Sequence, residues 1–118
     1  MTRVLVCGGR DYRDGERVSA VLHKLHSESG ISLIIEGGAK GADYLAHVWA
    51  CMETVPTERY DADWENQGSF AGPARNKRML EEGKPDLVIA FPGGRGTADM
   101  VRKARKAGVE VVEISHGP

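Results

Sequence analysis

Short apolar runs alternate with longer amphipathic stretches along the whole chain. The apolar runs predict strands over residues 4–7, 31–36, 55–60, 86–91 and 109–114. The stretches between them carry apolar residues at the i, i+3, i+4, i+7 spacing of a helix, as in Val18, Val21, Leu22 and Leu25. Strands that alternate with helices in this way are typical of βα units around a parallel sheet.

Local signals mark where the predicted helices begin and end. Asp14 and Gly30 predict the N-cap and the C-terminal end of the first helix. The third helix is predicted to begin near Pro73, because proline suits the first helical position. Thr97 predicts the cap of the last helix, which Gly108 ends. The inward-facing residues of that last helix are predicted to be Met100, Val101, Ala104 and Ala107.

These elements predict one α/β domain of the Rossmann-like type over residues 1–118. The run 86–91 is almost entirely apolar, as a central parallel strand should be, whereas Pro56 favours an edge position for the third strand. Right-handed crossovers then give a three-layer arrangement, a five-stranded parallel sheet in the order 3-2-1-4-5 with helices on both faces. The polar segment over residues 61–72, which carries Trp64, is predicted to be a long loop.

Three glycine-rich turns follow predicted strands and lead into helices, at residues 8–9, 37–41 and 93–96. In a parallel sheet all three lie at the carboxyl edge, where open α/β sheets bind their ligands. Such a turn offers backbone N–H groups with no Cβ in the way, and the helix behind it adds partial positive charge. We therefore expect a cleft that binds a phosphate group. Neither GxGxxG nor GxxxxGK[ST] is present, so a standard NAD-binding or ATPase site is not predicted.

Basic residues lie in or beside these turns and can neutralise a phosphate. They are Arg10, Lys40, Arg75 and Arg95, although Lys40 and Arg95 also suit a solvated surface. Arg75 can form a bidentate contact with a phosphate, and the adjacent Asn76 can read a base or a ribose.

Asp43 and Trp64 each have two interpretations. Asp43 can bind a ribose hydroxyl or complement the dipole of its helix, and Trp64 can stack on a base or plug a hydrophobic gap. The full set of candidate ligand-binding residues is Gly8, Gly9, Arg10, Gly37, Gly38, Lys40, Gly41, Asp43, Trp64, Arg75, Asn76, Pro92, Gly93, Gly94, Arg95, Gly96 and Thr97.

Composition narrows the classes of function. With 28% charged and 41% hydrophobic residues, the chain resembles an ordinary globular protein, and its formal net charge of −1 provides no overall positive field for DNA or acidic membranes. Cys7 and Cys51 have no CxxC or Cys/His metal spacing, so we expect free thiols, no metal site and a reducing, cytoplasmic location. No run resembles a signal peptide or a membrane span. No cofactor is expected to be required, and the ligand itself is of nucleotide type.

Two segments resemble those of known families. Residues 91–97, Phe-Pro-Gly-Gly-Arg-Gly-Thr, resemble the PGGxGTxxE loop of the Lonely Guy phosphoribohydrolases. Residues 36–43, followed by Ala46 and His47, resemble the SGxAxGID…AH segment of the DprA family of DNA-processing proteins. Both families belong to the SLOG superfamily of Rossmann-like domains. The combined motifs over residues 7–12, 37–43, 62–64, 71–76 and 92–99 are similar to the small YspA-like branch of that superfamily.

The resemblance to the Lonely Guy enzymes implies a phosphate loop without the family's catalytic carboxylate. The catalytic glutamate of that family falls at Met100, which can neither transfer a proton nor stabilise an oxocarbenium-like centre. Asp99 comes one residue early, about 100° away around a helix. The arginine that the family pairs with the glutamate corresponds to Arg75 or Arg78. If the chain is an enzyme, Asp99, Glu36 or Asp43 must replace the lost carboxylate.

Three functions therefore remain open. The first is a binding or sensor module for a nucleoside monophosphate or an ADP-ribose-like ligand. The second is a phosphoribohydrolase-like enzyme that acts on such a ligand. The third is DNA binding of the DprA kind, which the net charge of −1 and the absence of a basic stripe disfavour. The resemblance also implies a homo-oligomer, most simply a dimer.

Overall fold

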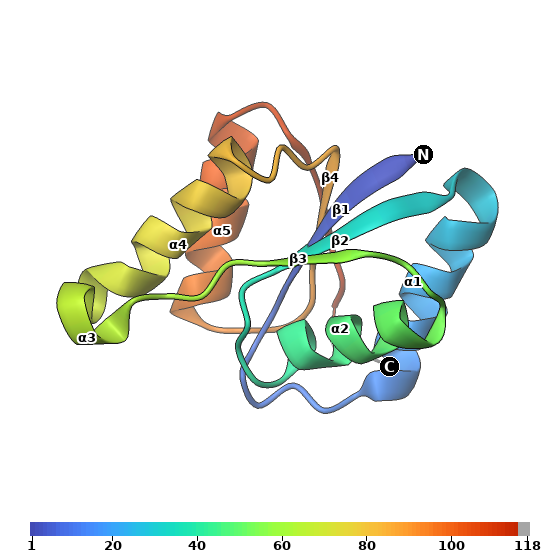
Figure 1. The fold of residues 1–118 in the computed structure, drawn as a ribbon, viewed down its shortest axis with the longest axis horizontal. Helices are drawn as coiled ribbons and strands as arrows, with labels where there is room; N and C mark the ends of the chain where they lie inside the picture. Colours follow the sequence, from blue (N-terminus) through green and yellow to red (C-terminus); the bar gives the residue numbers. More distant parts are fainter. Residues whose placement is uncertain (116–118) are drawn as a thin grey trace.

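The apolar runs form a five-stranded parallel sheet in the computed structural model, which describes residues 1–115 (Figure 1). Its strands are β1 (Thr2–Cys7), β2 (Ile31–Glu36), β3 (Thr57–Arg59), β4 (Leu87–Ala90) and β5 (Glu110–Glu113). They are ordered β3-β2-β1-β4-β5, with every neighbouring pair parallel. The predicted fold class and strand order are confirmed.

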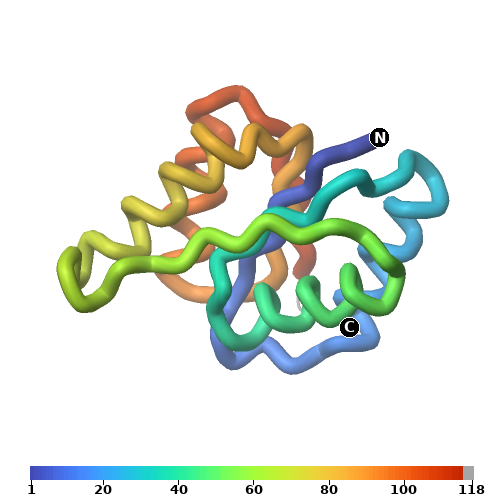
Figure 2. Tube along the Cα trace, viewed as in Figure 1, coloured from blue at the N-terminus to red at the C-terminus, as the bar shows by residue number. Residues whose placement is uncertain are grey.

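Helices cover both faces of the sheet, as Figures 1 and 2 show. The helical elements are α1 (Gly15–Ser29), α2 (Ala42–Met52), α3 (Trp64–Gln67), a 3₁₀ turn (Gly68–Phe70), α4 (Ala71–Glu81) and α5 (Arg95–Lys106). α1 and α2 lie against one face, and α4 and α5 lie against the other. The resulting three-layer arrangement leaves the carboxyl ends of the strands open between the two helical layers.

Alternation along β1 divides the core into two halves. Val4 and Val6 pack with the α1 and α2 layer, whereas Leu5 and Cys7 pack with Met79 of α4 and with α5. Because successive strand residues point to opposite faces, β1 contributes to both halves. The central strand therefore aligns the two helical layers with respect to each other.

The first helix begins and ends where the sequence predicts. The Asp14 carboxylate accepts a hydrogen bond from the Arg17 backbone N–H at 3.0 Å. Gly30 ends the helix with a φ of 72°, and its N–H donates to the His26 carbonyl. Both contacts satisfy backbone or capping groups that a helix end leaves unpaired.

The prediction for the last helix is partly wrong. Gly94 is its N-cap and the helix begins at Arg95, so Thr97 lies inside the first turn instead of capping it. Met100, Val101 and Ala104 are buried as predicted, but Ala107 is exposed because it follows the last helical residue. The threonine signal was misleading because a glycine turn can enter a helix without a side-chain cap.

The segment 61–72 is not the long loop that the sequence predicts. Asp63 caps the four-residue helix α3 by accepting a hydrogen bond from the Asn66 backbone N–H, and α4 then begins at Ala71. The helix therefore begins two residues before Pro73, which the sequence predicts near its first position. Pro73 still lies in the first turn of α4, where a missing N–H is tolerated. A helix this short has no apolar periodicity by which to recognise it.

Among residues 1–115, no helix is both long and apolar enough to cross a membrane. In the same range, no group of three or more His, Cys, Asp or Glu side chains is arranged to hold a metal ion.

Gly41 allows the first two glycine turns to pack against each other. It has a φ of 76° and a ψ of −128°, a conformation that other residues rarely adopt, and a Cβ here would collide with the Gly9 carbonyl. We expect Gly41→Ala to lower the free energy of unfolding by about 2 kcal/mol or more. Urea denaturation followed by circular dichroism measures this.

Gly96→Ala is the matched control for this prediction. Nothing lies within 4 Å of the position a Gly96 Cβ would take, and Gly96 is helical. We therefore expect Gly96→Ala to leave stability unchanged or to raise it by up to about 1 kcal/mol. Equal effects of the two substitutions would contradict the packing argument.

Candidate ligand-binding site

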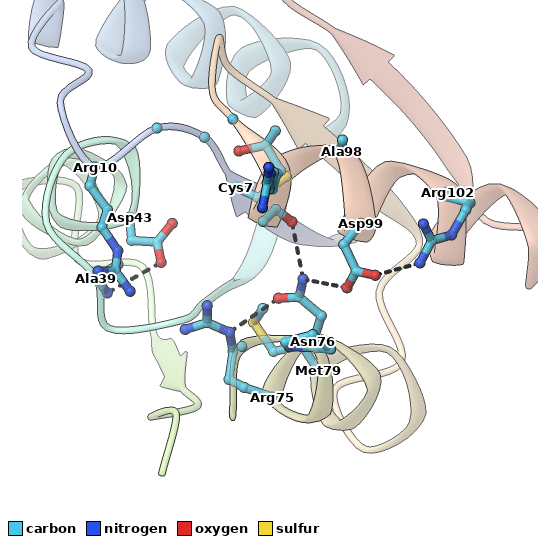
Figure 3. Close-up of a pocket in the computed structure, with 18 of the residues that line it drawn as sticks. Cys7, Arg10, Ala39, Asp43, Arg75, Asn76, Met79, Ala98, Asp99 and Arg102 are labelled. Carbon is cyan, nitrogen blue, oxygen red and sulfur yellow. Dashed lines mark hydrogen bonds and ion pairs between the residues drawn. The ribbon is translucent and has the colours of Figure 1, made fainter. Parts of the chain in front are cut away.

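A cavity of about 840 Å³ opens at the carboxyl edge of the sheet (Figure 3). This volume lies within the range of about 300–1,000 Å³ that is typical of small-ligand sites. The lining residues come from the end of β1 and the loop after it, from the turn after β2 and the start of α2, from α3 and the 3₁₀ turn, from α4, and from α5 with the residue before it. They are Cys7, Gly8, Gly9, Arg10, Ala39, Asp43, Trp64, Ser69, Gly72, Pro73, Arg75, Asn76, Met79, Gly94, Arg95, Gly96, Thr97, Ala98, Asp99 and Arg102.

The cavity brings together most of the candidates that the sequence singled out. Those that line it are Gly8, Gly9, Arg10, Asp43, Trp64, Arg75, Asn76, Gly94, Arg95, Gly96, Thr97 and Asp99. Those that do not are Glu36, Gly37, Gly38, Lys40, Gly41, Pro92 and Gly93. Pro92 and Gly93 instead line a second hollow of about 550 Å³, which shares Gly9, Arg10 and Gly94 with the main cavity. The turn after β2 is therefore the candidate segment that contributes least.

The backbone of Gly9 links the three glycine turns. Its N–H donates to the Pro92 carbonyl at 2.8 Å, and its carbonyl accepts from the Ala42 N–H at 3.2 Å. A Cβ on Gly9 would lie 3.0 Å from the Pro92 carbonyl oxygen, closer than ordinary contacts. Gly9 therefore serves close packing between the loops, and its N–H is already used within the protein.

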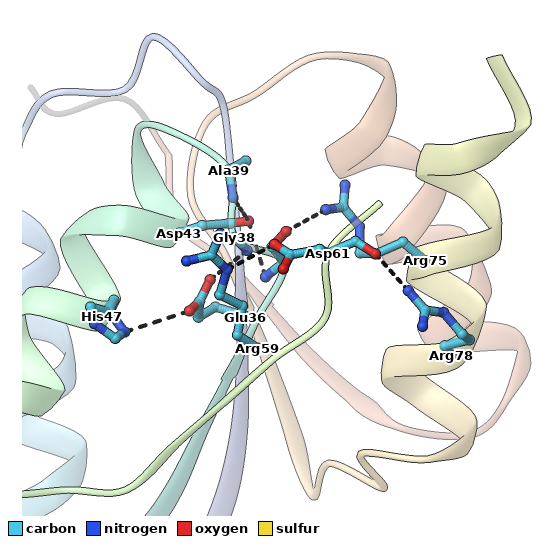
Figure 4. Close-up of polar contacts among 10 residues, drawn as sticks. Glu36, Gly38, Ala39, Asp43, His47, Arg59, Asp61, Arg75 and Arg78 are labelled. Atoms are coloured by element: carbon cyan, nitrogen blue, oxygen red, sulfur yellow. Dashed lines mark hydrogen bonds and ion pairs between the residues drawn. The ribbon is translucent and has the colours of Figure 1, made fainter. Parts of the chain in front are cut away.

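The turn after β2 is occupied by a carboxylate of the chain itself. Asp43 accepts hydrogen bonds from the Gly37 N–H at 3.1 Å and the Ala39 N–H at 3.3 Å, both to Oδ2 (Figure 4). From α4, Arg75 donates to the Gly37 carbonyl at 2.7 Å. An anion bound by such a turn would need these same N–H groups. The Asp43 side chain thus takes the place that a phosphate would occupy in this turn.

Burial raises the pKa of Asp43 to about 6. The two backbone N–H donors and the nearby Arg75 guanidinium favour the charged carboxylate, but they offset only part of the cost of removing it from water. Asp43 therefore remains charged near neutral pH at some cost to stability.

The turn before α5 is the open one. The first backbone N–H to donate within the helix is that of Ala98, which bonds to the Gly94 carbonyl at 3.0 Å. The N–H groups of Arg95, Gly96 and Thr97 precede it and have no intrahelical acceptor. All three residues line the cavity. Together with the helix dipole, these donors make the start of α5 suited to an anion.

The charges around the cavity favour a negatively charged ligand. Four arginines line it, Arg10, Arg75, Arg95 and Arg102, against the two carboxylates of Asp43 and Asp99. Even with both carboxylates ionised, the lining keeps a formal surplus of two positive charges. This local surplus contrasts with the net charge of −1 for the chain.

Asp99 belongs to a network that joins α4 to α5 (Figure 3). Asn76 is buried and donates to the Asp99 carboxylate at 3.0 Å and to the Gly96 carbonyl at 3.1 Å, while Lys103 contacts the same carboxylate at 2.8 Å. Burial alone would raise the pKa of Asp99, but the hydrogen bonds from Lys103 and Asn76 outweigh it and lower the pKa overall. Asp99 is therefore ionised near neutral pH and suited to act as a base, not as a proton donor.

The α5 positions 99 and 100 are placed differently from what the Lonely Guy resemblance implies. Met100 is fully buried between α5 and the sheet, with Leu5 and Met79 among its neighbours in the core. Asp99, one residue earlier, is turned by about 100° from that direction and lines the cavity. On α5 the carboxylate that reaches the candidate site is therefore at position 99, one residue before the position of the family's glutamate.

Glu36 does not line the cavity and instead contacts Gly38 in its own turn and His47 of α2 (Figure 4). Its side chain is 2% exposed, accepts a hydrogen bond from the Gly38 N–H, and faces His47 Nδ1 at 3.6 Å. Burial raises the pKa of Glu36. Since it does not reach the cavity lining, Glu36 is poorly placed as the replacement catalytic carboxylate.

Several lining residues were missed by sequence reasoning. Ser69 and Gly72 lie in the segment that the sequence predicts to be a loop, and Arg102 is one helical turn beyond Asp99 on the same face. That i, i+3 spacing was the available signal for Arg102. Cys7 also lines the cavity, but burial raises its pKa to about 12, so its thiol is neutral and unreactive at neutral pH.

Sequence comparisons identify relatives of this chain. The model of a family described as YspA, cpYpsA-related SLOG family matches residues 2–67. The gene 61 protein of Mycobacterium phage D29 is 38% identical over 126 residues, and the match covers 100% of both chains.

Solved structures share the fold at low sequence identity. DNA processing protein A (DprA) from Streptococcus pneumoniae has a TM-score of 0.54 and 22% identity, over 95% of this chain and 58% of that one. UDP-GlcNAc 2-epimerase from Neisseria meningitidis, solved with UDP-GlcNAc bound, has a TM-score of 0.61 and 16% identity, over 97% of this chain and 32% of that one. The chain therefore spans less than two thirds of either protein, and the likeness is one of fold.

The raised pKa of Asp43 makes stability depend on pH. Between about pH 4 and pH 6 the folded protein binds a proton that the unfolded chain has lost, so the Asp43 contribution to stability falls as pH rises. An asparagine amide oxygen can accept the same two N–H bonds without a charge. We expect Asp43→Asn to gain roughly 2–3 kcal/mol relative to wild type between about pH 4.5 and about pH 7.

Urea denaturation at the two pH values measures this difference. Asp14→Asn is the control, because it removes an exposed capping carboxylate without touching the buried turn. A constant offset between Asp43→Asn and wild type at both pH values would show that burial of this carboxylate costs nothing.

Proposed function

This chain belongs to the YspA, cpYpsA-related SLOG family, and we propose that its cavity binds the phosphate group of a nucleotide or nucleotide-derived ligand. The proposed ligand is a nucleoside monophosphate or an ADP-ribose-like molecule. In this role the protein is a binding or sensor module. Its cavity volume of about 840 Å³ accommodates ligands of this size.

The observation that carries this proposal is the open turn before α5. Among residues 1–115 it is the glycine turn in which no backbone N–H donates to another protein group, whereas Asp43 accepts two N–H bonds of the second turn and Pro92 accepts the Gly9 N–H of the first. A phosphate at residues 95–97 would receive backbone hydrogen bonds and the favourable end of the helix dipole. The surrounding arginines neutralise its second charge.

The proteins that share this fold support the choice of a nucleotide-type ligand only in general terms. The epimerase with the same fold was solved with UDP-GlcNAc, a nucleotide sugar, whereas DprA is a DNA-processing protein. Open α/β sheets bind ligands at the carboxyl edge whatever their chemistry. The proposal therefore rests on the cavity of this chain and not on either neighbour.

A second candidate function is hydrolysis of the N-glycosidic bond of such a ligand, with Asp99 as the carboxylate. The observation that favours it is that Asp99 is ionised and lines the cavity near the proposed phosphate turn. However, Lys103, Asn76 and Arg102 already neutralise or bind its oxygens. A carboxylate held in this way is a weaker nucleophile and base than a free one, which makes binding without turnover the better supported function.

Substitution of Gly96 tests the phosphate site by charge alone. The space around its missing side chain is open, so both Gly96→Asp and Gly96→Asn fit the fold. We expect Gly96→Asp to bind ribose 5-phosphate, a nucleoside monophosphate or ADP-ribose about tenfold more weakly than Gly96→Asn, because like charges repel. Isothermal titration calorimetry on the two variants measures the ratio.

The two variants differ only in charge, so their ratio removes steric effects. It should shrink as salt is added, since screening weakens charge repulsion. Equal binding by both variants would place the phosphate elsewhere, and no binding of any of these compounds to wild type would refute the proposed function.

Turnover distinguishes the two candidate functions. If the protein is a binding module, chromatography after incubation with nucleoside monophosphates will show no free base and no ribose 5-phosphate above the protein-free control. Base release that disappears in Asp99→Asn would instead establish the hydrolase, with Asp99 as a catalytic residue.

A further inference from the structure

Trp64 presents an aromatic ring to the mouth of the proposed phosphate site. It is the first residue of α3, it is 49% exposed, and its side chain lines the cavity. The other tryptophan, Trp49, is buried in the core beneath α2. A half-exposed tryptophan at the edge of a cavity has one ring face available to a ligand.

The position of this ring is fixed from below by α3 and α4. Asp63 caps α3 through the Asn66 N–H, which holds the short helix against the start of α4. Gly72 of α4 lies under the ring, and a Cβ there would come within 3.3 Å of Trp64 Cη2. The absence of a side chain at Gly72 thus lets the indole lie close against the helix.

An arginine lies over the Trp64 ring. The Arg10 guanidinium carbon lies 5.2 Å from the centroid of the Trp64 ring, in a cation–π contact. Arg10 comes from the loop after β1, is exposed, and lines the same cavity. Its contact therefore bridges the two sides of the cavity mouth while no ligand is bound.

The gap between Arg10 and Trp64 is too narrow for a base. A planar ring inserted between them needs two van der Waals layers, about 7 Å in all at a carbon–carbon contact distance of about 3.5 Å, against the 5.2 Å observed. A base can reach the indole only if the guanidinium leaves it. Arg10 is exposed, so its guanidinium can return to water when a base takes its place on the ring.

We propose that a nucleobase stacks on Trp64 in the place that Arg10 occupies in the free protein, so that the cavity selects nucleotides over base-free sugar phosphates. This inference rests on the proposed function, because the phosphate at the start of α5 brings the base to the mouth. Stacking on an aromatic side chain tolerates any base. The site therefore recognises a base as such and not one base in particular.

Affinity for ligands with and without a base tests the proposal. Ribose 5-phosphate carries the phosphate and sugar alone, and the four ribonucleoside 5′-monophosphates add a base. In wild type we expect the tightest of the four to bind at least about tenfold more tightly than ribose 5-phosphate, within the range of stacking on aromatic side chains. Isothermal titration calorimetry measures each affinity.

Variants of Trp64 attribute this selectivity to the ring. Trp64→Leu should bring the ratio of nucleotide to ribose 5-phosphate affinity close to one, and Trp64→Phe should keep part of the ratio. Because Trp64 is half exposed, both variants are expected to fold, which thermal unfolding checks. In wild type, the fluorescence of Trp64 should change when a nucleotide binds and not when ribose 5-phosphate binds. The Trp64→Phe variant contains Trp49 alone and measures the background fluorescence of that residue.

Arg10→Ala tests the exchange itself. Its effect on phosphate binding is common to both ligands, so it cancels in the ratio of nucleotide to ribose 5-phosphate affinity. We expect this ratio to rise, because the base no longer displaces a guanidinium. A fall in the ratio would mean that Arg10 itself holds the base, and it would overturn the exchange.

The proposed phosphate-binding function and the stacking of a base on Trp64 can be refuted separately. If neither ribose 5-phosphate nor any nucleotide binds, the proposed function is wrong and the stacking site falls with it. If wild type binds all of them with similar affinity, the phosphate site stands and the selection of a base by Trp64 is refuted.

Discussion

The close contact between the glycine turns at the carboxyl edge is the constraint on which the rest of the site depends. Gly9 donates to Pro92 and accepts from Ala42, so one residue joins the loops after β1, β2 and β4. Side chains would keep these backbones apart, at Gly41 most clearly. Glycine is therefore required here for packing as well as for ligand approach. Because the loops meet, their helices begin around a single cavity.

This constraint changes what a glycine-rich turn means. The three turns have equal status in the sequence, but the protein uses the Gly9 N–H of the first and several N–H groups of the second internally. Asp43 occupies the turn after β2 as a built-in anion, and its raised pKa reflects the cost. Within residues 1–115 the turn before α5 has no such partner, and it shares the cavity with four arginines. Binding capacity therefore follows from which turn the chain leaves unfilled, not from the number of glycines.

Sequence reasoning predicts best what depends on local pattern. Strand order and core helices follow from periodicity, and Asp14 and Gly30 act as their residue types imply. Sequence reasoning fails where contacts between residues that are distant in the sequence determine the local structure. Lys40 lies in a glycine turn as a phosphate ligand would, but Asp43 and Arg75 bond to the backbone of that turn, and Lys40 is exposed and does not line the cavity. The sequence predicts a loop around Trp64, because a four-residue helix has no apolar periodicity by which to detect it.

The contrast between Met100 and Asp99 shows why the phosphate loop and catalysis are separable. Met100 is fully buried against Leu5 and Met79, so a glutamate in its place would lie in the core, unpaired and largely uncharged. Restoring the family's glutamate would therefore not by itself restore its chemistry, because the helix would also have to turn towards the cavity. That turn would move Asp99, which with Asn76 ties α4 to the first turn of α5. The same network that ties the first turn of α5 to α4 thus opposes the geometry that catalysis by the family mechanism requires.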